Sequence, residues 1–95
     1  MPQFIIRIEL HETKGDDYRK LHSAMGHHGF LRTITGQDGI VYLLPTAEYL
    51  RFGPGLTAEK VREDAIAGAS TVSEKFAVLV AETNGPIVWR GLRSA

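Results

Sequence analysis

Apolar and polar residues alternate along the first part of the chain. Between residues 3 and 11, every second side chain is apolar, and only Ile5 departs from the pattern. A period of two is typical of a strand that is buried on one face and solvated on the other. The apolar side consists of Phe4, Ile6, Ile8 and Leu10. The pattern therefore predicts that the fold begins with a half-buried strand.

Two later segments have the 3.6-residue spacing of amphipathic helices. The first follows capping side chains at Thr13 and Asp16, and we expect it to end at Gly29 in a left-handed conformation. The second follows Thr57, which is a suitable N-cap. The small apolar stripe of this second helix consists of Ala58, Val61, Ala65, Ala69 and Val72. Such a stripe would allow the helix to pack close to a sheet.

A β-hairpin is predicted in the middle of the chain. Residues 30–35 and 40–44 are rich in β-branched and aromatic side chains, and the connection between them contains Asp38-Gly39, a pair that suits a tight turn. Pro45 removes a backbone donor and should end the second arm. We expect residues 47–52 to resume as an edge strand.

The last third of the chain predicts a final strand. Residues 76–81 are almost continuously apolar, which indicates a central strand, and residues 87–92 leave open a short extra strand at the C-terminus. The complete order is that of a ferredoxin-like βαββαβ domain. We therefore expect an α+β fold, with a four-stranded antiparallel sheet and two helices on one face, in a single domain of residues 1–95.

Composition narrows the function. Eleven Lys and Arg residues balance eleven Asp and Glu residues, so DNA binding is not expected and RNA would need a local cationic patch. The chain has no Cys, which excludes disulfides and thiolate metal sites. Since no signal peptide or membrane-length apolar run is seen, we expect a cytoplasmic protein without membrane contact. A domain this small often completes its core with a second copy, so a homodimer is expected.

Histidines and arginines are the candidate functional residues. His22, His27 and His28 do not converge on one face of a helix, so we expect neither a metal site nor a cofactor. His11 ends the first strand, and His22 borders the apolar stripe of the first helix. Either could move a proton, although a solvated strand end and a half-buried helix position explain them equally well.

Arginines and aromatic residues in and beside the predicted strands indicate a second chemistry. Arg7 lies on the polar face of the first strand, while Arg32, Tyr49 and Arg51 belong to later strands. Guanidinium groups bind phosphates and aromatic rings stack on bases, so this set could bind single-stranded RNA. The same residues also fit a solvated sheet edge and an ordinary core, and both alternatives stay open.

The pattern across residues 3–92 resembles the GhoS-like family of small bacterial proteins, named for the antitoxin of type V toxin-antitoxin systems. The matching residues are Arg7-Ile8-Glu9-Leu10-His11, Asp17-Tyr18, Leu21-His22, Met25, Gly29-Phe30, Arg32-Thr33-Ile34, Asp38-Gly39 and Leu44-Pro45-Thr46-Ala47-Glu48-Tyr49. The resemblance implies a ferredoxin-like fold related to the CRISPR adaptation nuclease, and an endoribonuclease that cleaves the messenger RNA of a membrane-acting toxin. The CRISPR nuclease has an acidic metal ligand near the end of its first strand, where this chain has Leu10-His11-Glu12.

These considerations lead to a hypothesis of metal-independent RNA cleavage. His11 and His22 would share the proton transfers, and Arg32 would stabilise the charge that grows on phosphorus. The expected RNA-binding residues are Arg7, Tyr49 and Arg51. Two alternatives remain: a non-enzymatic homodimer that uses its sheet face for binding or regulation, and a module that holds a small ligand at a dimer interface.

Overall fold

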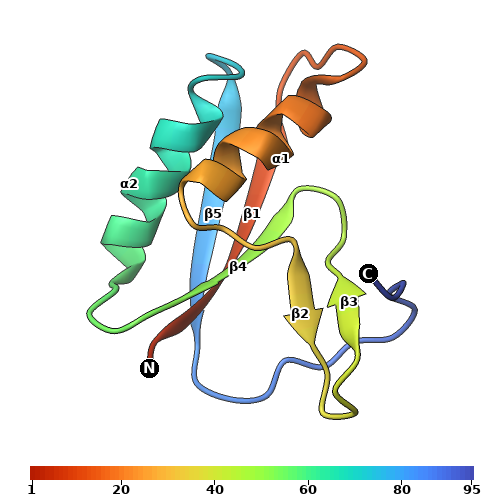
Figure 1. The fold of residues 1–95 in the computed structure, drawn as a ribbon. Helices are drawn as coiled ribbons and strands as arrows, with labels where there is room; N and C mark the ends of the chain where they lie inside the picture. The colour runs from red at the N-terminus through yellow and green to blue at the C-terminus, as the bar shows by residue number, and fades with distance from the viewer.

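Two helices and five strands follow one another along the chain. The computed structural model describes residues 1–95 (Figure 1). The elements are β1 (Gln3–Leu10), α1 (Asp17–His27), β2 (Thr33–Thr35), β3 (Val41–Leu43), β4 (Glu48–Phe52), α2 (Ala58–Ala69) and β5 (Phe76–Thr83). The protein is thus an α+β protein with antiparallel sheets, as expected from its sequence. Neither helix is long and apolar enough to cross a membrane.

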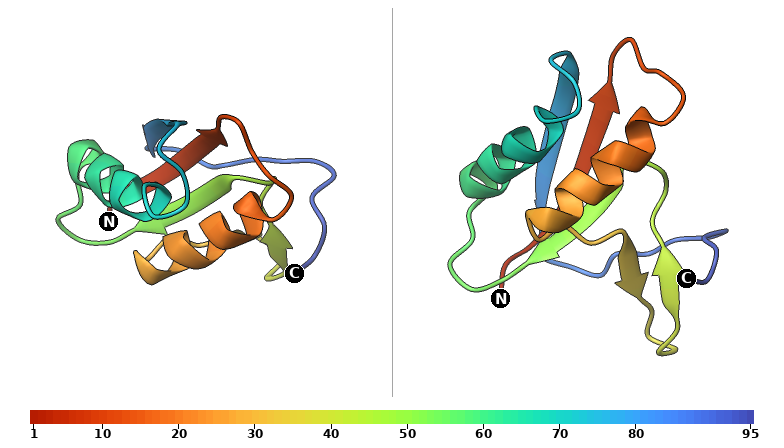
Figure 2. Two further views of the ribbon diagram at one scale, coloured as in Figure 1. Left: turned by 90° about the horizontal axis from the view of Figure 1, so that it is seen from above. Right: turned by 45° about the horizontal axis from the view of Figure 1, so that its top comes forward.

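The main sheet has three antiparallel strands in the order β4-β1-β5. In its register, Ile6 of β1 lies between Tyr49 of β4 and Val80 of β5. Both helices cover one face of this sheet (Figures 1 and 2). The predicted apolar side of β1 lies beneath them and is buried, so the alternation identified the correct face.

The helices contribute the other half of the main core. Leu21 and Met25 of α1 and the small residues of α2 pack on the sheet, so the two helices contact each other closely. The hydroxyl of Thr57 accepts a hydrogen bond from the Lys60 amide at 3.1 Å, and the expected N-cap is confirmed. Gly29 has a φ of 85° just beyond α1, as predicted for the end of that helix.

The predicted hairpin is present, but it does not extend the main sheet. Strands β2 and β3 form a separate two-stranded sheet. The main sheet therefore has three strands, where four were expected. Only Leu31 still pairs with β4, through two 2.8 Å backbone hydrogen bonds with Leu50. From Arg32 onwards the backbone of this segment bonds to β3 and its flanks, beginning with the bond from the Leu44 amide to the Arg32 carbonyl, and its path no longer runs beside β4.

Strand β5 lies at an edge of the sheet, and the expectation of a central strand was wrong. Phe76, Val78 and Val80 face the helices, whereas Ala77 and Leu79 are exposed on the other face. A nearly continuous apolar run indicates burial on both faces, but here only alternate residues are covered. The central strand is β1.

The C-terminal segment, residues 84–95, crosses the face of the sheet that the helices leave open. Residues 87–92 do not form the additional strand considered above. Backbone pairing begins later, where Arg93 accepts from the Leu43 amide and Ala95 donates to Val41, both at 2.8 Å. A second small core forms beneath this segment, and its members are Ile5, Ile34, Tyr42, Leu44, Leu50, Ile87, Trp89 and Leu92. The C-terminal segment consequently covers part of the sheet face that the helices leave open.

Candidate functional site

A histidine and a tyrosine meet where α1 crosses β4. The Nδ1 atom of His22 lies 2.7 Å from the phenolic oxygen of Tyr49, and their rings pack edge to face with centroids 5.8 Å apart. Tyr49 is completely buried, whereas His22 is half-buried at the margin of the core. The hydrogen bond therefore fixes one side of an imidazole whose other side lies near solvent.

The surroundings hold both groups in their uncharged forms. Burial lowers the pKa of His22 below its ordinary value of 6.5, and the nearby positive charge of Arg32 lowers it further. Burial raises the pKa of Tyr49 to about 12, although Arg32 acts in the opposite direction. At neutral pH the imidazole is thus unprotonated at one nitrogen and able to accept a proton.

Arg32 lies at the start of the hairpin, near enough for its charge to act on both groups. Its carbonyl accepts a hydrogen bond from the Leu44 amide at 2.8 Å, while its exposed guanidinium has no acidic partner. Arg32 lines a hollow of about 340 Å³ together with Thr46 and Arg93. Arg93 also has no acidic partner. Two uncompensated cations beside one hollow favour an anionic ligand.

His11 lies in a different part of the molecule. Its Nε2 atom is 3.1 Å from Glu9 Oε1, and the side chain borders a shallow hollow beside Lys75. Arg7 also lies away from the His22 pair, because its guanidinium contacts Glu48 at 2.8 Å on the exposed sheet face. The structure therefore does not join His11 or Arg7 to His22 in one site.

Arg51 and Tyr49 have internal partners. The guanidinium of Arg51 pairs with Asp64 of α2 and lies 5.0 Å above the ring of Phe30. Burial acts to raise the pKa of Asp64, but its bonds to Lys60 and Arg51 outweigh this effect and lower it. Because the ring of Tyr49 is fully buried, an RNA base cannot stack on it in this conformation.

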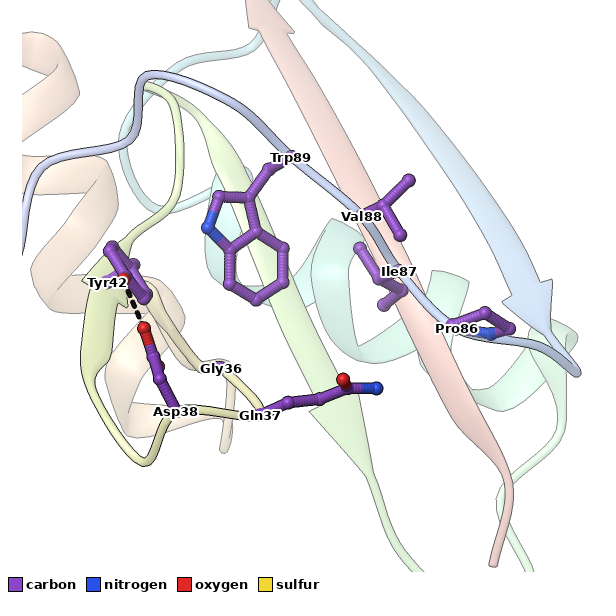
Figure 3. Close-up of a pocket in the computed structure, with 8 residues that line it drawn as sticks. All are labelled: Gly36, Gln37, Asp38, Tyr42, Pro86, Ile87, Val88 and Trp89. Atoms are coloured by element: carbon purple, nitrogen blue, oxygen red, sulfur yellow. Dashed lines mark hydrogen bonds between the residues drawn. The ribbon is translucent and has the colours of Figure 1, made fainter.

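A third hollow, of about 310 Å³, was not predicted from the sequence. It lies between the β2–β3 turn and the C-terminal segment, with Trp89, Tyr42, Asp38 and Gln37 around it (Figure 3). The sequence contains its components, namely a polar turn at residues 36–39 and the chain's only tryptophan at position 89. The contact between these two segments, however, depends on how the C-terminal segment crosses the sheet.

No group of three or more His, Asp or Glu side chains is arranged to hold a metal ion. The fold and site therefore define a small α+β protein with a neutral histidine–tyrosine pair beside unpaired arginines. No protein-family model matches the sequence, and no curated protein matches it either.

Proposed function

We propose that this protein is a metal-independent endoribonuclease that acts on single-stranded RNA. The observation that carries the proposal is the 2.7 Å contact between His22 and Tyr49, within reach of the charge of Arg32, whose guanidinium has no acidic partner. A proton acceptor next to a free cation is what cleavage through the ribose 2′-hydroxyl requires. The GhoS-like resemblance adds a specific form of the proposal, in which the target is the messenger RNA of a toxin.

The chemistry assigns a role to each group. In the tautomer in which Nδ1 donates to Tyr49, the Nε2 atom of His22 accepts the 2′-hydroxyl proton. The 2′-oxygen then bonds to phosphorus, the bond from phosphorus to the 5′-oxygen breaks, and water protonates the leaving oxygen. Arg32 and Arg93 would bind the phosphate oxygens as their negative charge grows.

The proposal includes a ferredoxin-like ancestry for the fold. The order β5-β1-β4, with Leu31 bridged to the outer side of β4, corresponds to such a sheet whose fourth strand has been reduced to one pairing. The separate hairpin then follows as an elaboration of that strand. This ancestry is consistent with the position of both helices on the same face of the main sheet.

The test is cleavage of a mixed-sequence single-stranded RNA with and without EDTA. We expect cleavage to persist in EDTA and to fall by about 100-fold or more in His22→Ala and in Arg32→Ala. His27→Ala, on the exposed side of the same helix, and Arg62→Ala, an unpaired arginine on α2, are the matched controls and should cleave normally.

His11 is tested in the same assay because the sequence hypothesis gave it part of the proton transfer. His11→Ala should retain activity, since its side chain contacts Glu9 and not the His22 pair. Unchanged cleavage by a folded His11→Ala/His22→Ala double variant would refute the proposed chemistry altogether.

A second candidate function is that of a non-enzymatic homodimer that binds through its sheet. Large apolar side chains are exposed on the side away from the helices: Phe52 is 50% exposed, Leu79 66% and Val88 83%. Exposed apolar patches often mark contacts between proteins. Sedimentation analysis would show a dimer that Leu79→Lys dissociates, while Ile66→Lys on α2 would leave it intact. RNA binding should weaken steeply with salt, whereas this apolar contact should not.

A further inference from the structure

The hollow beside Trp89 combines an aromatic wall with solvent-exposed polar side chains. The rings of Trp89 and Tyr42 pack edge to face, with centroids 5.4 Å apart and planes inclined by 62°. Figure 3 shows the indole standing beside the cavity, with Ile87 on the neighbouring side. An edge-to-face contact fixes the indole in place, so a flat ligand would meet a preorganised stacking surface.

The turn approaches these rings closely because residue 36 is glycine. A Cβ at Gly36 would lie 2.6 Å from Asp38 Oδ1, 3.1 Å from the Tyr42 ring and 3.4 Å from the Trp89 ring. The backbone of the turn thus forms part of the pocket wall. The polar side chains of the turn are consequently placed next to the indole.

The carboxylate of Asp38 is oriented but not saturated. Oδ1 accepts from the Ile40 amide at 3.0 Å, and Oδ2 accepts from the Tyr42 hydroxyl at 2.7 Å. These two bonds, the first foremost, lower the pKa of Asp38, so the group is ionised at neutral pH. A carboxylate offers about four acceptor positions, which leaves roughly two for a ligand.

Gln37 supplies a further free polar group. Its carboxamide makes no hydrogen bond within the protein and is exposed. Figure 3 shows its side chain extending from the turn towards the C-terminal segment, along the opening of the pocket. The carboxamide can both donate and accept, which suits the edge of a heterocyclic ring.

The pocket and the arginine hollow share lining residues with the same intermediate hollow. It shares Ile87, Val88 and Trp89 with a neighbouring hollow of about 320 Å³. That neighbour in turn shares Leu44, Pro45 and Leu92 with the hollow lined by Arg32 and Arg93. A ligand with a ring at one end and phosphates at the other could follow the C-terminal segment from one hollow to the next.

We propose that this pocket binds one guanine base of single-stranded RNA, stacked on Trp89 with its two adjacent N–H donors directed at Asp38. The inference rests on the proposed function for its choice of RNA. Guanine is the base whose pairing edge presents two neighbouring donors, N1–H and the N2 amino group, to a carboxylate. Adenine and cytosine place a ring acceptor beside their amino group, and uracil has one donor between two carbonyls, so each of them would set an acceptor against Asp38.

The test uses the fluorescence of Trp89, which is the only tryptophan in the chain. Full-length protein is titrated with GMP, AMP, CMP and UMP. We expect saturable quenching by GMP at concentrations at least about tenfold lower than for the other nucleotides, since correct hydrogen-bond readout discriminates by about 1–3 kcal/mol.

Two variants examine the polar contacts. Asp38→Asn should abolish the preference for GMP, and Gln37→Ala, which removes no internal hydrogen bond, should weaken GMP binding several-fold. Glu63→Gln on the exposed side of α2 removes the same charge as Asp38→Asn and should bind GMP normally. Circular dichroism melts confirm that each variant is folded.

The outcomes separate this inference from the nuclease proposal. Equal quenching by all four nucleotides, quenching by none, or stronger quenching by the amide of N-acetylphenylalanine would each overturn the guanine pocket. GMP-selective quenching without RNA cleavage would support the pocket and reject the nuclease. Cleavage that depends on His22 without GMP binding would support the nuclease and reject the guanine pocket.

Discussion

The Nδ1 atom of His22 and the phenolic oxygen of Tyr49 lie 2.7 Å apart and join α1 to β4 at the margin of the main core. Neither group has another hydrogen-bond partner in the protein. One hydrogen bond therefore joins the two groups, and Arg32 lies close enough to influence the charge of both. The stability of the fold and the chemistry of the proposed site depend on the same pair.

Removal of the tyrosine hydroxyl should have a measurable cost. Tyr49→Phe keeps the buried ring but leaves His22 Nδ1 without a partner, and we expect the free energy of unfolding to fall by about 1 kcal/mol. Urea denaturation measures this change. In the His22→Ala background the cost of Tyr49→Phe should be close to zero, so an equal cost in both backgrounds would contradict the coupling.

The lowered pKa of His22 predicts how stability depends on pH. In the unfolded chain this group takes up a proton near its ordinary value of 6.5, whereas the folded protein binds it only at lower pH. The stability that His22 contributes through its lowered pKa is thus complete above about pH 7. It is lost as the pH falls through 6.5 towards the pKa of His22 in the folded protein. Urea denaturation at pH 7 and pH 5.5 should show a smaller loss in His22→Gln than in the wild type, and His27→Gln should behave like the wild type.

The ion pair between Arg51 and Asp64 should be stronger than the ion pair between Arg7 and Glu48. Arg51 and Asp64 are 17% and 18% exposed, and Arg51→Ala would leave a largely buried carboxylate without one of its partners. We expect this variant to lose about 2 kcal/mol. Arg7 is 63% exposed in its pair with Glu48, so Arg7→Ala should cost less than about 1 kcal/mol. Similar costs in thermal or urea melts would show that burial does not govern these pairs.

Gly36 should tolerate no side chain. The Cβ of Gly36→Ala would collide with the Asp38 carboxylate and crowd the ring of Tyr42, so both side chains must shift and the hydrogen bonds of Asp38 are disturbed. We expect a loss of about 1–3 kcal/mol, a changed emission of Trp89 without any ligand, and weaker GMP binding. Gly39→Ala is not an adequate control because Gly39 has a φ of 80°, whereas Gly85→Ala meets nothing within 4 Å and should leave the emission unchanged.

Local patterns predicted most of the secondary structure. The alternation in β1, the Thr57 cap, the end of α1 at Gly29 and the Asp38-Gly39 turn all depend on neighbouring residues, and each is found where the sequence placed it. Of the candidate site residues, His22 lies within reach of the charge of Arg32, whereas His11 contacts Glu9 in another part of the molecule. Residue type alone does not specify which strand end faces which helix.

The sequence by itself determined the elements, the buried face of β1 and the chemical types available for a site, because these follow from side-chain periodicity and from turn and cap preferences over a few residues. Tertiary structure alone decided that the hairpin of β2 and β3 stays separate from the main sheet, and that β5 lies at the edge of that sheet. It also brought Trp89 beside Asp38 and Arg93 beside Arg32. Those contacts depend on where the C-terminal segment finds uncovered apolar surface and free backbone groups on β3, which no local pattern in that segment specifies.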